Sequence, residues 1–357
     1  MKIADIRLRS FKIPLKSELR WGEKKSLAAL EHLLVEVELQ GGAVGRGEVA
    51  VRPTIYGETA ASVRGAVSWL RPLLLGSDAG DPRALAQTLA RLPCNLAAKA
   101  ALEMAAREAA ARRRGLTLAE TLPRGRERVR VSFIVGQGGV AATLESAAFA
   151  YAHGVRVFKL KTGKDAALDE ERIRELTAAF TDAEVYADAN ETLEPSSAAH
   201  RLERWRSLGV TMVEEPLPVE MISARKALRA ARLLPLIADD SAFTPRDLER
   251  ELEQDTFDIL NVKPARSGFY WSLKMLERAH SAGKEAMIGS QAMSSFGAAR
   301  AALLAFHPAV SRPSELSFHL LSSGGFSDFP QIKDGWLYYH DLARAAFDEE
   351  AFRSFET

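Results

Sequence analysis

Residues 157–161 read VFKLK, a short apolar run that ends in a lysine. The same pattern recurs in VYADAN (185–190), MVEEP (212–216), LIADD (236–240) and DILNVK (258–263), each about one strand-plus-helix unit from the next. In a parallel barrel the strand ends meet on one rim, and such barrels build their active sites there. The spacing therefore predicts a ring of side chains made by Lys161, Asp188, Glu214, Asp239 and Lys263.

The segments around these runs alternate between strand and helix from about Val129 onward, which is the pattern of a parallel sheet covered by helices. Segments such as 169–180, 196–205 and 270–282 are each long enough for one covering helix. Eight such units favour a closed barrel, so we expect an α/β fold with a (β/α)8-type barrel. The candidate strands begin near Val129, Val157, Val185, Met212, Leu236, Ile259, Glu285 and Glu315.

The first part of the chain has a different pattern. Apolar and charged residues alternate there, as in Ile6 to Arg9, which is typical of strands. The glycine-rich stretch QGGAVGRGE (40–48) is not followed by an amphipathic helix, which favours a hairpin turn over a dinucleotide-binding loop. We therefore expect an α+β capping domain at 1–125, a barrel at 126–320 and a carboxy-terminal segment at 321–357 that packs back on the capping domain.

Composition excludes several classes of partner. The chain has 357 residues, which suits one barrel plus a smaller domain, and a formal net charge of +1, so no global field attracts nucleic acid or an anionic membrane. No apolar stretch approaches the roughly 18 residues that span a bilayer. Cys94 is the single cysteine, which excludes an intrachain disulfide and suits a reducing compartment. We expect a cytoplasmic location.

The order of the ring residues predicts a metal site. If the strand near Val129 is the first, the three carboxylates end the third, fourth and fifth strands, and Lys161 and Lys263 face them from either side. Ligation by oxygen alone suits Mg²⁺ better than zinc. We therefore expect Asp188, Glu214 and Asp239 to hold Mg²⁺. Spacing alone does not distinguish Glu214 from Glu215, or Asp239 from Asp240.

Carbanion chemistry explains this set of residues. Removing a proton from the carbon next to a carboxylate creates an enediolate, which requires positive charge where the anion develops. One lysine on each face allows proton removal from one side and return on the other, but a basic lysine needs a pKa below about 10.4. Lys159 shares a strand face with Lys161, so it is either a cause of such a shift, a substrate contact or a structural partner of a ring carboxylate.

These motifs resemble the enolase superfamily, specifically its muconate-lactonising-enzyme subgroup, over essentially the whole chain. KLK (159–161) is similar to the Lys-x-Lys motif of that subgroup, and the metal ligands follow in VYADAN, VEEPL and IADDS, with Lys263 in LNVKPARSG. The stretch RPTIYGET (52–59) resembles the loop that the capping domain lays over the barrel mouth. The resemblance implies Mg²⁺-dependent proton abstraction alpha to a carboxylate, with Lys161 and Lys263 as the acid–base groups, and a homo-oligomer.

Departures from the family pattern bear on the substrate. Asp240 stands where members commonly have glutamate, and the Asp-x-Asp pair by which dipeptide epimerases hold a substrate ammonium is missing from Ser314 to Phe318. We expect Asn190 and Asp240 to support the metal ligands. The candidate substrate-binding residues are Lys159, Arg20 beside Trp21, Tyr56, Ser290 and Glu315.

The leading hypothesis is an isomerase that racemises or epimerises an N-acyl amino acid or a dipeptide-like carboxylate. Muconate-type cycloisomerisation and o-succinylbenzoate-synthase-type dehydration use the same ring and remain alternatives. A non-catalytic carboxylate-binding protein is a minor alternative.

Overall fold

The computed structural model describes residues 1–20 and 26–357, without the side chains of residues 17–20, 26, 27 and 56. The chain begins with an antiparallel sheet in the order β1-β2-β3. Helices α2 and α4 pack on this sheet, and α3 follows α2. The bounds are β1 (Ile3–Arg20), β2 (Ser26–Leu39), β3 (Val44–Ala50), α1 (Pro53–Tyr56), α2 (Ala60–Leu74), α3 (Pro82–Leu89), α4 (Leu96–Arg113) and η1 (Ala119–Thr121).

The glycine-rich stretch is a hairpin, as the sequence predicted. Strands β2 and β3 pair antiparallel across the turn at 40–43. Gly45 and Gly47 lie in β3 against α4, where a Cβ atom would overlap the backbone of Ala105 and Ala101. These two glycines therefore serve close packing of helix on sheet, which only a residue without a side chain allows.

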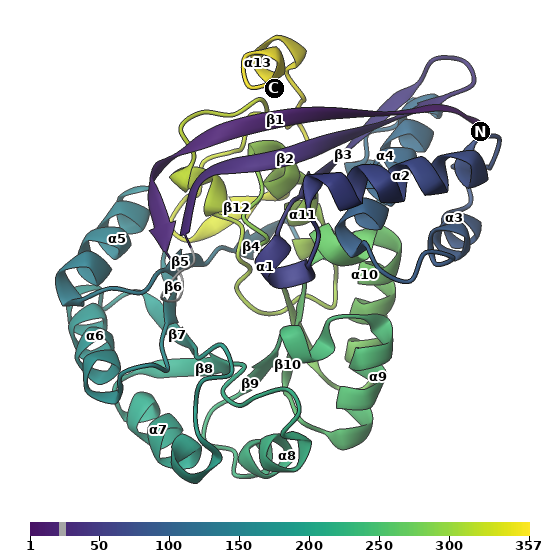
Figure 1. The fold of residues 1–357 in the computed structure, drawn as a ribbon. Coiled ribbons are helices and arrows are strands. Elements are labelled where there is room, and N and C mark those ends of the chain that lie inside the picture. The colour runs from purple at the N-terminus through teal and green to yellow at the C-terminus, as the bar shows by residue number, and fades with distance from the viewer. Residues whose placement is uncertain (21–25) are drawn as a thin grey trace.

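The second part of the chain is a curled sheet of seven parallel strands in the order β11-β10-β9-β8-β7-β6-β5, with helices outside the ring (Figure 1). The strands are β5 (Phe133–Val135), β6 (Val157–Lys161), β7 (Glu184–Asp188), β8 (Val210–Glu214), β9 (Leu236–Ala238), β10 (Ile259–Val262) and β11 (Glu285–Ile288). The helices are α5 (Val140–Ala152), α6 (Ala166–Ala179), α7 (Pro195–Ser207), α8 (Ile222–Ala230), η2 (Asp240–Ala242), α9 (Pro245–Gln254), α10 (Pro264–Ser281) and α11 (Ser295–Ala305).

Two of the eight expected strands differ from the prediction. Val129 lies in β4 (Arg128–Arg130), which pairs antiparallel with β12 (Trp336–Tyr338), and the first strand of the large sheet is β5. Residues 310–316 contain no assigned strand in the described structure. Pro313, within this segment, has no amide hydrogen for a ladder.

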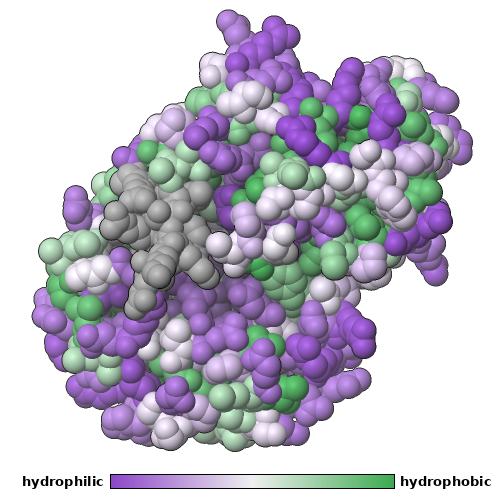
Figure 2. Space-filling view, in the orientation of Figure 1, coloured by the Kyte–Doolittle hydropathy of each residue, from purple (hydrophilic) through white to green (hydrophobic). Residues whose placement is uncertain are grey.

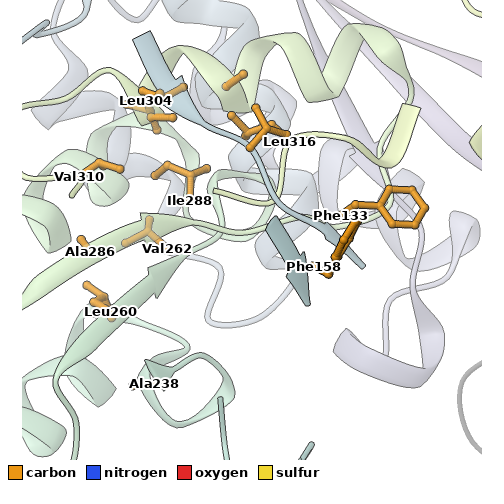
Figure 3. Packing of buried hydrophobic residues seen from close by; sticks show 14 of the residues in the cluster. Phe133, Phe158, Ala238, Leu260, Val262, Ala286, Ile288, Leu304, Val310 and Leu316 are labelled. Carbon is orange, nitrogen blue, oxygen red and sulfur yellow. The ribbon is translucent and has the colours of Figure 1, made fainter. Parts of the chain in front are cut away.

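The segment 310–316 nevertheless links the two edges of the sheet. Ser314 forms a parallel bridge with Val131 and accepts a bond from Ser132 N (2.8 Å), while Glu315 N donates to Ile288 O of β11 (2.8 Å). Val310 and Leu316 join one buried apolar cluster with residues of β5, β6, β10 and β11 (Figure 3). The two sheet edges are thus connected by hydrogen bonds and by a shared core.

The carboxy-terminal segment divides into two parts. Trp336–Tyr338 pairs with β4, whereas the last residues pack on β1, where Lys12 N donates to Phe355 O (2.9 Å) and Thr357 N donates to Ser10 O (3.0 Å). Phe352 packs with Phe11 in an aromatic cluster, and α13 lies beyond β1 (Figure 1). The elements are η3 (Phe318–Leu321), α12 (Tyr339–Leu342) and α13 (Glu349–Arg353). None of the described helices is long and apolar enough to cross a membrane.

Buried glutamates join the amino-terminal elements to the helices of the large sheet. Glu48 of β3 accepts bonds from Ser294 N (2.9 Å) and Gly297 N (3.0 Å) at the start of α11. Glu103 of α4 accepts bonds from the backbone of Phe269 (2.6 Å) and Tyr270 (3.2 Å), where α10 bends at Gly268. Since each carboxylate accepts bonds from backbone amides at a helix start or bend, these contacts fix how the amino-terminal sheet and α4 sit on the helices of the large sheet.

Candidate active site

The strands present their side chains to the interior of the ring in layers. One layer is apolar and consists of Val157, Tyr186, Met212, Ile237, Ile259 and Met287. Since side chains on one face of a strand are two residues apart, the next residues on this face are Lys159, Asp188, Glu214, Asp239, Asn261 and Gly289. One step further, Lys161 and Lys263 stand at the ends of β6 and β10. Hydrophilic residues accordingly gather in the hollow of the ring (Figure 2).

Lys159 lies among three carboxylates. Its Nζ is 2.5 Å from Glu214 Oε1, 2.6 Å from Glu315 Oε1 and 2.9 Å from Asp188 Oδ2. Burial lowers the pKa of Lys159, but the three carboxylates raise it well above its ordinary value. Lys159 keeps 2% of its side-chain surface exposed, against 18% for Lys161 and 12% for Lys263. Lys159 is thus paired with three carboxylates and closed to solvent, whereas Lys161 and Lys263 keep more of their surface exposed.

Lys161 stands at one end of the row of carboxylates. Its Nζ donates to Asp188 Oδ2 (2.6 Å) and to Asn190 Oδ1 (2.8 Å), and Asn190 N donates to Asp188 Oδ1 (2.9 Å). Asp188 is buried, which raises its pKa, but Lys159 and Lys161 hold that pKa below the ordinary value. Asn190 thus touches both Lys161 and Asp188, the place that the sequence predicted for a supporting residue.

Lys263 stands at the other end of the row. Its Nζ donates to Asp239 Oδ2, and Arg266 donates to Asp239 Oδ1 (3.1 Å) and to Asp239 O (2.8 Å). Arg266 also reaches Asp240 Oδ1 (3.3 Å). Burial lowers the pKa of Lys263, but Asp239 and Asp240 raise it above the ordinary value, which is opposite to the lowered pKa that we expected of a basic lysine. Because β7, β8 and β9 lie between β6 and β10, the two lysines meet the carboxylates from opposite ends.

The structure separates the two adjacent glutamates that spacing alone did not. Glu214 points into the ring, whereas Glu215 accepts bonds from Asp239 N (2.7 Å), Ser241 N (2.8 Å) and Ser241 Oγ (2.7 Å). Burial raises the pKa of Glu215 to about 7. Glu215 therefore holds the backbone that carries Asp239 and does not belong to the interior row.

Glu315 and Ser290 lie together at the closing side of the ring. Glu315 is buried, with Oε1 on Lys159 and Oε2 accepting a bond from Ser290 N (2.7 Å). Both carboxylate oxygens of Glu315 are thus paired within the protein. Substrate binding by these two residues stays a prediction, as it does for Lys159.

The stretch 52–59 is held at both ends. Arg52 donates to Ala292 O (2.7 Å), in the loop after β11, and Glu58 accepts bonds from Ala97 N (3.0 Å) and Ala98 N (3.4 Å) at the start of α4. Tyr56 falls between these anchors, but its side chain lies outside the described residues, as do the side chain of Arg20 and the whole of Trp21. Their roles in substrate binding stay predictions.

The interior row has the chemistry of a hard-cation site. In the described part of the chain no group of three acidic, histidine or cysteine side chains is arranged to hold a metal ion, and lysine ammonium groups lie against the carboxylates. Burial raises the pKa of Glu214 well above its ordinary value, and although Lys159 opposes this, the carboxylates of Asp188, Glu315 and Asp239 add to it. Asn261 Oδ1 is buried beside Glu214 without a hydrogen-bond partner. Crowded carboxylates and an unpaired amide oxygen fit Mg²⁺, which prefers oxygen ligands.

Sequence reasoning missed Asn261 and Arg266, and it considered Glu215 only as an alternative to Glu214. The position of Asn261 could have been predicted, because side chains two residues apart in a strand lie on the same face and Asn261 precedes Lys263 by two residues. Arg266 lies three residues after Lys263 at the start of α10, which places it near the strand end but does not indicate its partner. The bonds of Glu215 to the backbone of Asp239 and Ser241 had no signal in the sequence.

Two family models and several known proteins match this chain. The family model for the mandelate racemase / muconate lactonizing enzyme N-terminal domain matches residues 24–122. The family model described as enolase C-terminal domain-like matches residues 142–343. The L-Ala-D/L-Glu epimerase of Bacillus subtilis is 29% identical over 309 residues, 85% of this chain and 84% of that protein. The N-succinylamino acid racemase of Thermus thermophilus is 30% identical over 322 residues, 89% of this chain and 86% of that protein.

A solved structure gives the same result. The muconate lactonizing enzyme from Mycobacterium smegmatis, complexed with muconolactone, superposes with a TM-score of 0.92 at 29% identity, covering 100% of both chains. Fold and relatives together define the protein as an isomerase. The chain belongs to the mandelate racemase/muconate lactonizing enzyme family of the enolase superfamily, in the muconate-lactonising subgroup, as its motifs predicted.

Proposed function

We propose that this protein is a Mg²⁺-dependent racemase or epimerase that moves a proton at the carbon next to a substrate carboxylate. The observation that carries the proposal is the placement of Lys161 and Lys263 at opposite ends of one row of carboxylates. A proton removed on one face and returned on the other inverts the carbon between them.

Asp188, Glu214 and Asp239 are the residues that would hold Mg²⁺. When bound, the ion supplies positive charge that stabilises the negative charge developing on the substrate carboxylate. Lys161 and Lys263 each exchange one proton with the α-carbon, so the C–H bond that breaks on one face is replaced by one that forms on the other. Asn190, Arg266 and Glu215 orient these groups through the bonds described above.

The substrate we propose carries an N-acyl group rather than a free ammonium. Dipeptide-like substrates with a free amine need an unpaired carboxylate to receive it, but both oxygens of Glu315 are already bonded, to Lys159 and to Ser290 N. An N–H that is acylated carries no charge and requires no such partner. The relative from Thermus thermophilus, named an N-succinylamino acid racemase, supports this choice.

Two alternatives use the same ring. Cycloisomerisation is supported by the likeness to a muconate lactonizing enzyme, and dehydration of the o-succinylbenzoate-synthase type requires one lysine for proton transfer and the other for charge stabilisation. A carboxylate-binding protein without activity is the least favoured, since the row and both lysines are intact. In each case we take residues 310–316 as the eighth strand position of a closed barrel, on the strength of their bonds to both sheet edges.

The test is solvent exchange. The protein is incubated in D₂O with Mg²⁺ and separate antipodes of N-acyl amino acids, dipeptides and unsaturated diacids, and deuterium at the α-carbon is measured by NMR. We expect exchange from both antipodes of at least one N-acyl amino acid, and its loss on chelation. Absence of exchange from every N-acyl amino acid and dipeptide contradicts the assignment. Lactone formation from a diacid instead favours the cycloisomerase.

A further inference from the structure

Arg172 of α6 lies behind the end of β6, outside the row of carboxylates. It is 2% exposed, and its guanidinium reaches three groups from three parts of the chain. Nη1 donates to Lys161 O (2.8 Å), Nη2 donates to Gly136 O (2.6 Å) just after β5, and Nε donates to Thr143 Oγ1 of α5 (2.7 Å). A planar fork with fixed donors suits this task, because it ties two neighbouring strand ends to one rigid helix.

Asp169, one helical turn before Arg172, completes the contact. Its Oδ2 accepts bonds from Gly163 N (2.7 Å) and from Arg201 (2.9 Å). Gly163 adopts φ +106°, and a Cβ atom there would overlap Thr192 Oγ1. The backbone on either side of Thr162 is therefore held from α6, through the carbonyl of Lys161 and the amide of Gly163.

This anchor acts on one face of the site. The end of β10 is held by a different set of bonds, because the carbonyl of Lys263 accepts from Arg266 N (3.0 Å) and from Ser267 Oγ (3.0 Å). None of the contacts described for Arg172 involves the Lys263 side. The bonds from α6 to the end of β6 are thus separate from the bonds that hold the end of β10.

We propose that Arg172, with Asp169, is a positioning residue for Lys161 that sets the reach of one acid–base lysine independently of the other. The inference rests on the proposed two-lysine function and extends it. A base must lie within hydrogen-bond reach of the proton that it abstracts, and a misplacement of about 1 Å costs on the order of 100-fold in rate. Lys161 reaches the substrate from a strand end that Arg172 fixes.

The experiment compares antipodes within one protein sample. The antipode that exchanges through Lys161 is the one whose exchange is lost in Lys161→Ala. In Arg172→Lys, which keeps the charge and loses the fork, we expect deuterium exchange from that antipode to fall roughly 10- to 100-fold. Exchange from the other antipode should change by less than about 3-fold, and it reports that the variant is folded and holds Mg²⁺.

Two further variants make the comparison specific. Asp169→Asn should show the same one-sided loss, because it weakens the bond to Gly163 N. Arg300→Lys is the matched control: Arg300 is also buried and helical, pairs with Glu108 (2.7 Å) away from the site, and should leave the ratio of the two exchange rates unchanged. The inference is overturned if folded Arg172→Lys and Asp169→Asn lose deuterium exchange equally from both antipodes. It is also overturned if neither variant loses exchange from any antipode. Failure of the wild-type protein to exchange any antipode instead counts against the proposed function itself.

Discussion

Substitution of Glu103 by glutamine should change how the stability of the protein depends on pH. Glu103 is buried at the contact between α4 and the bend in α10, where it accepts the amides of Phe269 and Tyr270. Burial raises its pKa from 4.5 to about 6, against the opposing effect of Arg107 and the two amides. Glutamine keeps one acceptor oxygen for these amides and does not ionise.

The sign and size follow from linkage. In the folded protein Glu103 retains its proton up to about pH 6, whereas in the unfolded chain it loses the proton near pH 4.5. Between these values the folded state binds more protons, so this group lowers the free energy of unfolding as pH rises. The rise in pKa from 4.5 to about 6 corresponds to about 2 kcal/mol of stability, which is fully present below pH 4.5 and lost by about pH 7.

Urea denaturation of Glu103→Gln and of the wild type from pH 4.5 to 7.5 measures this directly, since other titrations cancel in the difference. From pH 4.5 to 7.5 the free energy of unfolding of the variant, relative to that of the wild type, should rise by about 2 kcal/mol. Glu108→Gln is the control on the same helix. Burial raises the pKa of Glu108, but Arg300 and Arg112 hold it below 4.5, so its stabilisation is lost only as pH falls below about 4.5, and the difference for Glu108→Gln stays nearly constant from pH 4.5 to 7.5. A pH-independent difference for Glu103→Gln would refute the reasoning.

Three other predictions concern packing, the domain contact and the metal. Gly163→Ala should cost at least about 2 kcal/mol more than Gly283→Ala in thermal unfolding, because both glycines have positive φ but only Gly163 faces an overlap, with Thr192 Oγ1; equal costs contradict this. Glu48→Gln should cost about 2–4 kcal/mol in urea, since both oxygens of Glu48 serve buried donors, and a loss under about 0.5 kcal/mol counts against that role. Mg²⁺ at 100 times its dissociation constant should stabilise the wild type by about 2.7 kcal/mol and leave Asp188→Asn unchanged, whereas an equal effect on both places the metal elsewhere.

Much of the site was predictable because strand ends follow a simple rule. A regular interval of ionisable residues after apolar runs gave the row Asp188, Glu214 and Asp239 and the flanking lysines, and motif resemblance chose Glu214 over Glu215. The irregular part was not predictable in this way. Residues 310–316 connect the sheet through single bridges and a serine side chain, and this arrangement has no periodicity to detect.

Contacts between residues far apart in the chain could not be predicted from the sequence either. Arg172 meets the end of its own strand unit, but nothing in its local sequence indicates that its guanidinium faces inward to two carbonyl groups. Lys159 shares a strand face with Lys161, as predicted, yet its burial among three carboxylates depends on Glu315, which comes from a segment 156 residues away. Spacing gives the face of a strand, and only the folded arrangement of the strands determines which charges meet across the sheet.

The central claim is that two lysines act on opposite faces of one α-carbon. The most direct measurement is deuterium exchange from each antipode of a turned-over N-acyl amino acid in Lys161→Ala and Lys263→Ala, with Mg²⁺ present. The account predicts that each variant loses exchange from one antipode and retains it from the other, with the two losses on opposite antipodes. Loss of exchange from the same antipode in both variants, or from both antipodes in one variant and neither in the other, would contradict it.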